Sequence, residues 1–185
     1  MKHVAVYGIY LTQRAAERAV TELKSEGIDS SDVSVLFESS TTTKAFAHEN
    51  GSKASEGEAT GSLSGATLGG VLGWLAGMGT LTIPGVRPLI AAGPLMAMLA
   101  GAGTGGRGGG ITGALIGFGI PEDEAKRFER RISDGGILLS VHTESEEDGT
   151  KARKVLERTE ATDISQKLED KEISRNLATC AKNVQ

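Results

Sequence analysis

The side chains that most often carry out acid–base or metal chemistry are few and scattered in this sequence. The three histidines, His3, His48 and His142, belong to different parts of the chain and have no partners at the spacing of metal ligands. The single cysteine, Cys180, cannot form an internal disulfide and has no companion for a structural zinc site. No nucleophile, base and orienting group can be named together. We therefore expect a protein that is not an enzyme, holds no metal and no cofactor, and discloses no small-molecule substrate.

Two local patterns need a decision between a chemical and a structural interpretation. His142 alternates with Ile137, Leu139 and Val141 and so faces away from them, which predicts an ordinary histidine on a sheet surface. A local group of acids could attract a cation, but acidic residues are also favoured in the first turn of a helix. They are Glu144, Glu146, Glu147 and Asp148. The structural interpretation is the simpler one in both cases.

One glycine motif matches a nucleotide-binding pattern by its letters alone. Residues 101–106, Gly-Ala-Gly-Thr-Gly-Gly, fit G-x-G-x-x-G. They follow an apolar helical run instead of a strand, and no suitable acidic residue occurs about twenty positions later. We therefore expect no nucleotide site there.

Charge divides the chain of 185 residues into three parts. It carries 20 basic and 24 acidic side chains, a formal charge of −4, without a basic block, so a nucleic-acid partner is not expected. Between Glu58 and Glu122 the only charged residues are Arg87 and Arg107. The first residues run directly into a strand pattern without the apolar core of a signal peptide, so we expect a cytoplasmic domain that is not secreted.

The two charged parts have the patterns of two βαβ units. In residues 1–37, a strand over 4–10, a helix over 13–26 capped by Thr12 and ended by Gly27, and a strand over 32–37 are expected. In residues 120–165, Pro121 begins a helix to about 133, a strand follows over 137–143, Ser145 caps another helix, and 161–165 form a short strand. Residues 38–56 are interpreted as a linker and 166–185 as a polar tail. The prediction is an α+β, ferredoxin-like sandwich, with helices on one face of a mainly antiparallel sheet and an insertion over residues 57–119.

The insertion is dominated by glycine, with 21 of the 26 glycines of the chain between residues 51 and 119. They recur every four residues in two ladders, a spacing that lines small residues along one side of a helix and lets two helices approach closely. We expect the ladders to face each other as a glycine-zipper helical hairpin, with residues 79–88 as its turn. The predicted packing residues are Gly57, Gly61, Gly65, Gly69, Gly73 and Gly77 in the first ladder, and Gly93, Ala97, Gly101, Gly105, Gly109, Gly113 and Gly117 in the second.

Glycines turned inward leave large apolar side chains turned outward. A glycine-rich helix is difficult to justify in water, because each glycine costs roughly 1 kcal/mol against alanine. The first helix would be about 33 Å long, close to the thickness of a bilayer's hydrocarbon core. The expected membrane- or partner-facing residues are Leu68, Leu72, Trp74, Leu75, Leu95, Leu99, Leu115 and Phe118.

Three interpretations of the insertion remain open: a hairpin in or on a membrane, zippers buried between protein subunits, and a flexible glycine-rich linker. Arg107 inside the second ladder is the main objection to a simple membrane span, because an arginine at the bilayer centre costs roughly 2.5 to 3.5 kcal/mol on insertion scales.

Several stretches together resemble a bacterial protein family. They are Val4–Tyr10 with Ala15–Leu23, Trp74–Gly77, Ile83–Pro94, Gly119–Ala125 and Gly135–His142. In these stretches the sequence, over roughly residues 3–165, is similar to the bacterial heat-induced or general stress protein family. The resemblance implies a stress-associated, non-enzymatic role, and it supplies no catalytic residues. The run of glycines around Arg107 departs from the family's usual alanine and glycine ladder.

The functional expectation combines these points. The leading hypothesis is a stress-associated protein whose hairpin binds or enters a membrane or mediates homo-oligomerisation, with membrane lipid and further copies of the chain as partners. The alternative is a soluble self-assembling structural protein, in which hairpins from many copies pack together as a particle, filament or shell.

Overall fold

The structure is a computed structural model that describes residues 3–38, 79–81, 89–95 and 110–169. Within these residues it is a mixed α+β fold with one six-stranded sheet, in the order β3-β4-β2-β5-β1-β6. Each described strand pairing is antiparallel. The elements in chain order are β1 His3–Tyr10, α1 Gln13–Ser25, the 3-10 turn η1 Ser30–Asp32, β2 Val33–Glu38, β3 Gly79–Leu81, β4 Leu89–Ala92, α5 Gly110–Gly117, α6 Glu122–Ser133, β5 Ile137–Thr143, α7 Glu146–Arg158 and β6 Thr162–Glu169.

The two ends of the chain interleave in the sheet. β5, from the second half, lies between β1 and β2 of the first half, and β1 lies between β5 and β6. Neither half can form these pairings alone, because both neighbours of β5 come from the first half and both neighbours of β1 come from the second half. The sheet joins residues that are more than a hundred positions apart, as in the pairing of Val6 with Val141.

Local signals at the helix ends agree with the sequence-based expectations. The side chain of Thr12 accepts a hydrogen bond from the Ala15 backbone N–H, and Ser145 accepts one from that of Asp148. Gly27 follows α1 with φ of +84°, in the left-handed region that glycine adopts readily. These residues define where α1 and α7 begin and where α1 ends.

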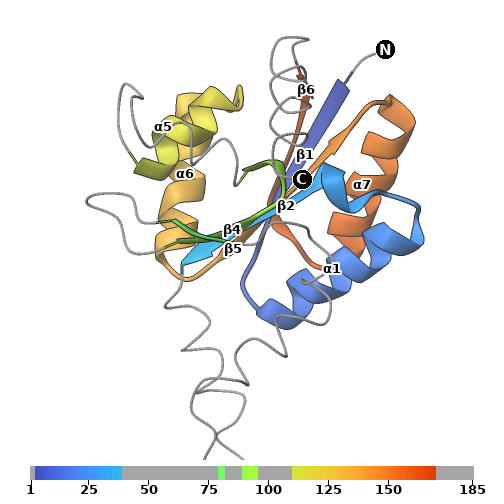
Figure 1. The fold of residues 1–185 in the computed structure, drawn as a ribbon, viewed down its shortest axis with the longest axis horizontal. Helices are drawn as coiled ribbons and strands as arrows, with labels where there is room; N and C mark the ends of the chain where they lie inside the picture. The colour runs from blue at the N-terminus through green and yellow to red at the C-terminus, as the bar shows by residue number, and fades with distance from the viewer. Residues whose placement is uncertain (1–2, 39–78, 82–88, 96–109, 170–185) are drawn as a thin grey trace, which may run out of the picture.

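Helices cover both faces of the sheet, α1 and α7 on one and α5 and α6 on the other (Figure 1). Successive strand residues point to opposite faces, so each strand supplies two cores. In β1, Val4, Val6 and Tyr10 pack with the α1/α7 core, while Ala5, Tyr7 and Ile9 pack with the α5/α6 core. The expectation of helices on one face alone is corrected, because the end of the predicted insertion and the helix that follows it provide a second layer.

Three element boundaries also differ from the expectations. Strands β3 and β4 occupy Gly79–Leu81 and Leu89–Ala92, where the turn and the start of a second long helix were predicted. Strand β6 continues to Glu169, so residues 166–169 belong to the sheet instead of the polar tail. Pro121 occupies the N-cap position of α6 without a side-chain hydrogen bond, and the helix begins at Glu122. For β3, β4 and β6, pairing with neighbouring strands creates or extends the element, and no local pattern signals it.

Candidate functional site

Most of the predicted packing residues lie outside the described part of the chain. This applies to the whole first ladder and to Ala97, Gly101, Gly105 and Gly109 of the second, together with Leu68, Leu72, Trp74, Leu75 and Leu99. Three ladder glycines are described, namely Gly93, Gly113 and Gly117. The three described apolar residues of the prediction are Leu95, Leu115 and Phe118.

Gly93 has a specific role at the end of β4, and it is not helix packing. Its φ is +76°, and a Cβ atom there would come within 2.1 Å of the Val33 carbonyl oxygen. Glycine is required both by the backbone conformation and by this close approach to β2. The prediction that Gly93 belongs to a helix–helix stripe is therefore corrected.

The prediction that Leu95, Leu115 and Phe118 face a membrane or a partner is wrong. All three are buried in the protein's own α5/α6 core, where they belong to the cluster that includes Leu36 and Leu138 of the sheet. The prediction treats the ladder as one continuous helix with its glycines turned toward a partner helix. In the structure, Ile111 and Leu115 of α5 turn toward the sheet instead.

Helix α5 is held by α6 as well as by the sheet. Thr112 on α5 donates a hydrogen bond from its hydroxyl to the Glu129 carboxylate on α6. On the outer side Ile116 is exposed, and a Cβ on Gly117 would meet nothing within 4 Å. The described end of the second ladder thus has one face packed within the chain and one face open.

A buried polar cluster lies beneath this layer, on the face of the sheet that α5 and α6 cover. Ser34 on β2 and Ser140 on β5 are register partners, and both are fully buried. The Ser34 hydroxyl oxygen accepts a hydrogen bond from the Leu95 backbone N–H at 3.1 Å. The Ser140 Oγ and the His142 Nε2 lie 3.2 Å apart. The cluster therefore links the centre of the sheet to the residues that follow β4.

A serine beside a histidine is the pair that nucleophilic catalysis uses, so its accessibility matters. His142 is 7% exposed, and its ring lies 5.5 Å from that of Phe118 and 5.9 Å, edge-on, from that of Tyr7. These aromatic rings occupy the space a substrate would need next to the pair. The arrangement gives the buried polar groups of Ser34, Ser140 and His142 hydrogen-bond partners between the sheet and the helices that cover it.

The prediction for His142 is half right. It does face away from Ile137, Leu139 and Val141, as the alternation in β5 required. It is not a surface residue, because α5 and Phe118 cover that face. Strand alternation was visible in the sequence, whereas the covering helix was not.

Asp32 is the last residue of η1, directly before β2, and its carboxyl group has a shifted pKa. Partial burial, followed by the nearby charge of Asp29, raises its pKa from the ordinary 3.8 to about 6. Hydrogen bonding from Ser31 and the electrostatic interaction with His142 oppose this shift. The carboxyl group is consequently sensitive to pH in a range where most aspartates are fully ionised.

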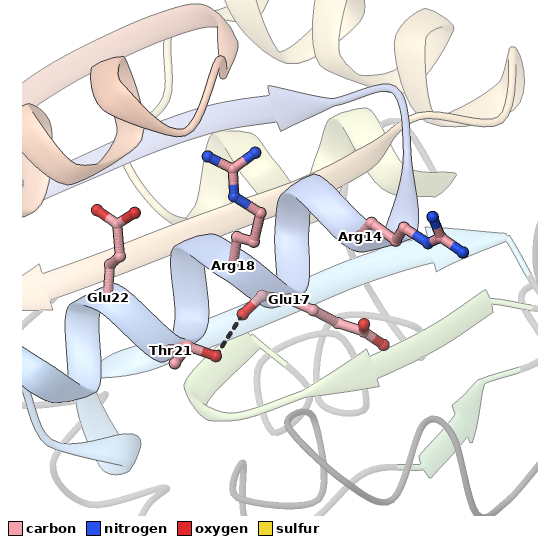
Figure 2. Close-up of a pocket in the computed structure, with 5 residues that line it drawn as sticks. All are labelled: Arg14, Glu17, Arg18, Thr21 and Glu22. Atoms are coloured by element: carbon pink, nitrogen blue, oxygen red, sulfur yellow. Dashed lines mark hydrogen bonds between the residues drawn. The ribbon is translucent and has the colours of Figure 1, made fainter.

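The outer face of α1 lines a hollow of about 470 Å³. Figure 2 shows the five residues of this face, which come from successive turns of one helix, with the Thr21 hydroxyl donating to the Glu17 backbone carbonyl at 2.8 Å. Two bases and two acids share the surface, so its charges select neither an anion nor a cation. The lining residues are Arg14, Glu17, Arg18, Thr21 and Glu22.

The described residues contain neither a metal-binding cluster nor a helix of membrane-spanning type. Among them, no three His, Cys, Asp or Glu side chains lie close enough together to hold a metal ion. None of the helices described here combines the length and the apolar composition that crossing a bilayer requires. Comparison of the chain with protein-family models, with curated proteins and with solved structures gives no match.

Proposed function

We propose that the protein is a non-enzymatic, stress-associated bacterial protein whose glycine ladders mediate association with a membrane, with other copies of the chain, or with both. The observation that carries the proposal is the repetition of small residues at intervals of four along two segments that each hold a single charged residue, 57–77 with Glu58 and 97–109 with Arg107. This spacing lets two helices come into close contact. The link to stress is the resemblance described above.

The rest of the chain supports a compact domain from which these segments depart. We propose that β1, α1, β2, β5, α7 and β6 form a ferredoxin-like unit. The support is their order in the sheet, β2-β5-β1-β6, with two interleaved βαβ units and with α1 and α7 both in the same core. β3 and β4 extend this unit at its β2 edge.

The residues flanking the first ladder segment lie at that same edge. β2 ends at Glu38, which pairs with Leu89, and β3 begins at Gly79, which pairs with Ala91 on the same strand, β4. Residues 39–78 therefore leave the sheet from β2 and return to it one strand beyond β4. An insertion with both ends at one edge can associate with lipid or protein while the sheet stays intact.

The corrected positions reduce the surface that lipid would need to cover. Leu95, Ile111, Leu115 and Phe118 are buried within the chain, so they require no partner. This burial favours the second candidate, a self-assembling structural protein in which the remaining ladder residues of several copies pack against one another. In that case the protein itself shields the apolar surface.

The test combines flotation with liposomes on a density gradient and light-scattering mass determination without detergent. Flotation with lipid, and aggregation without it, would support the membrane-associated form. A defined species of high mass that stays at the bottom of the gradient would support self-assembly.

Substitutions in the ladders test close packing itself. We expect Gly69→Leu and Gly109→Leu to abolish most flotation or high-mass assembly, because leucine keeps the backbones apart. The matched controls Gly69→Ala and Gly109→Ala add one methyl group and should retain most of either property. If the leucine variants behave as the unaltered chain does, close packing of the ladders is wrong.

A further inference from the structure

The two outer strands of the sheet differ greatly in the edge they offer. β3 has three residues, whereas β6 has eight. Ser165–Glu169 pair with His3–Tyr7 of β1 in unbroken register. Within the described residues no strand pairs with the other side of β6, so its outward backbone N–H and C=O groups form a regular edge. Such an edge is a template for another strand.

The side chains of β6 point alternately to the α7 side and to the α6 side of the sheet, and Gln166 lies on the α7 side between Ile164 and Leu168. On the α7 side, Ile164 packs partly against the core, and Leu168 is 63% exposed. On the α6 side, the Ser165 hydroxyl donates to Glu124 Oε1 at 3.0 Å, and Lys167 Nζ lies 3.1 Å from Glu124 Oε2. A strand that pairs with β6 must therefore match a large apolar residue on one face and a lysine on the other.

We propose that the edge of β6 binds the β6 edge of a second copy of this chain, antiparallel and centred on Gln166. In this register, each Leu168 lies opposite the other copy's Ile164, so two apolar pairs flank the symmetry axis. Each Lys167 lies opposite the other copy's Ser165. The two sheets join into one continuous sheet across the pair.

The register centred on Lys167 is less favourable than the proposed one. Centring the pair on Lys167 places the two lysines opposite each other and Leu168 opposite Gln166, which combines like charges with a lost apolar pair. At the other end, Asp163 has a positive φ of 52°, and the register of β6 with β1 shifts nearby. The regular edge therefore begins at Ile164, the first residue that the proposed register uses.

Cross-linking of the full-length chain tests the register directly. In a Cys180→Ser background, Gln166→Cys places the two thiols opposite each other at the symmetry axis. Mild oxidation should convert more than half of this variant into a covalent dimer. The matched control is Leu11→Cys, because Leu11 is also exposed and follows the end of β1 that pairs with Thr162. Antiparallel pairing of β6 therefore sends the two copies' Leu11 to opposite ends.

A charge substitution supplies a second readout. Leu168→Lys in the Gln166→Cys background should slow cross-linking about tenfold or more, the equivalent of about 1.4 kcal/mol of pairing free energy. Leu11→Lys in the same background should leave the rate unchanged. Both leucines are exposed, so neither change should alter the urea midpoint of unfolding by much.

Two outcomes would overturn the proposal. One is a Gln166→Cys variant that cross-links no faster than the Leu11→Cys control. The other is a Leu168→Lys variant that cross-links as fast as its parent. Association through the glycine ladders would raise the cross-linking rates of the Gln166→Cys and Leu11→Cys variants alike. Only pairing through β6 would raise the rate of Gln166→Cys alone.

Discussion

Gly93 illustrates that membership of a sequence ladder and the physical need for glycine are separate properties. It stands in a series of small residues spaced by four, yet its neighbours are Val33 and Ser34 of an adjacent strand. A side chain at this position would collide with backbone, which cannot move aside as the tip of a side chain can. The residue is therefore needed by the sheet.

We expect Gly93→Ala to lower the free energy of unfolding by about 2 kcal/mol or more, because strain at positive φ and the collision with Val33 act together. Urea unfolding followed by circular dichroism measures this change. Gly27→Ala is the matched control, since Gly27 has φ of +84° but would meet nothing within 4 Å. It should cost only about 1 kcal/mol for the left-handed conformation. Equal losses of unfolding free energy at the two positions would show that the close approach to Val33 makes no contribution to the cost of Gly93→Ala.

Asp32 gives a prediction about pH. Its pKa is raised to about 6 in the folded protein, so the folded state holds this proton more tightly than the unfolded state does. The resulting stabilisation is fully present below about pH 4 and is lost as the pH rises through 6. We expect Asp32→Asn to remove this loss, so that the variant gains stability relative to the unaltered chain between pH 4 and 7, measured by urea unfolding at each pH.

Asp29 contributes to stability with the opposite dependence on pH. The Ser31 backbone N–H donates to its carboxylate and holds its pKa below the ordinary value. Its contribution is present at neutral pH and is lost as the pH falls. A pH profile that is identical in Asp32→Asn and in the unaltered chain would contradict the assignment to Asp32.

At the scale of elements, α5 decides how the end of the second ladder is interpreted. Ile111, Ala114 and Leu115 turn toward the sheet and α6, while Ile116 faces outward. An apolar helix does not reveal from its sequence which face is buried, because each side offers similar side chains. Contact with the sheet selects the buried face.

We expect Leu115→Ala to cost about 2–5 kcal/mol of unfolding free energy, because it leaves a cavity between α5 and the sheet. Ile116→Ala, on the exposed side of the same helix, should cost less than about 1 kcal/mol. Urea unfolding of both variants checks the difference. A negligible effect of Leu115→Ala on unfolding, accompanied by a loss of flotation, would restore the original expectation of a membrane-facing residue.

At the scale of the whole molecule, the interleaved strands explain how one chain can carry a long insertion without losing its core. The α1/α7 core draws on residues from Val4 to Phe37 and from Ile137 to Ile164, and so closes over both halves. The residues that flank 39–78 lie in β2 and β3, on one side of the sheet, and the proposed pairing surface is at the opposite edge, β6. Association through the ladders and pairing through β6 would therefore use separate ends of the sheet.

The sequence by itself determined the elements of the two charged parts, because their signals are local. Alternation in β1 and β5, the caps Thr12 and Ser145, and the left-handed Gly27 each depend on residues within a few positions. The same local alternation placed His142 opposite Ile137, Leu139 and Val141. The mixed α+β class followed from the order of these elements.

Only the tertiary structure decided which faces are covered and where pairing extends a strand. β3 and β4 form because β2 offers them a partner, and β6 reaches Glu169 because β1 continues alongside it. The burial of Leu115, Phe118 and His142 depends on contacts between α5 and strands that are distant in sequence. A four-residue repeat indicates that close packing is possible on one side of a helix. Burial also depends on the surface that packs against that side, and the repeat does not specify this surface.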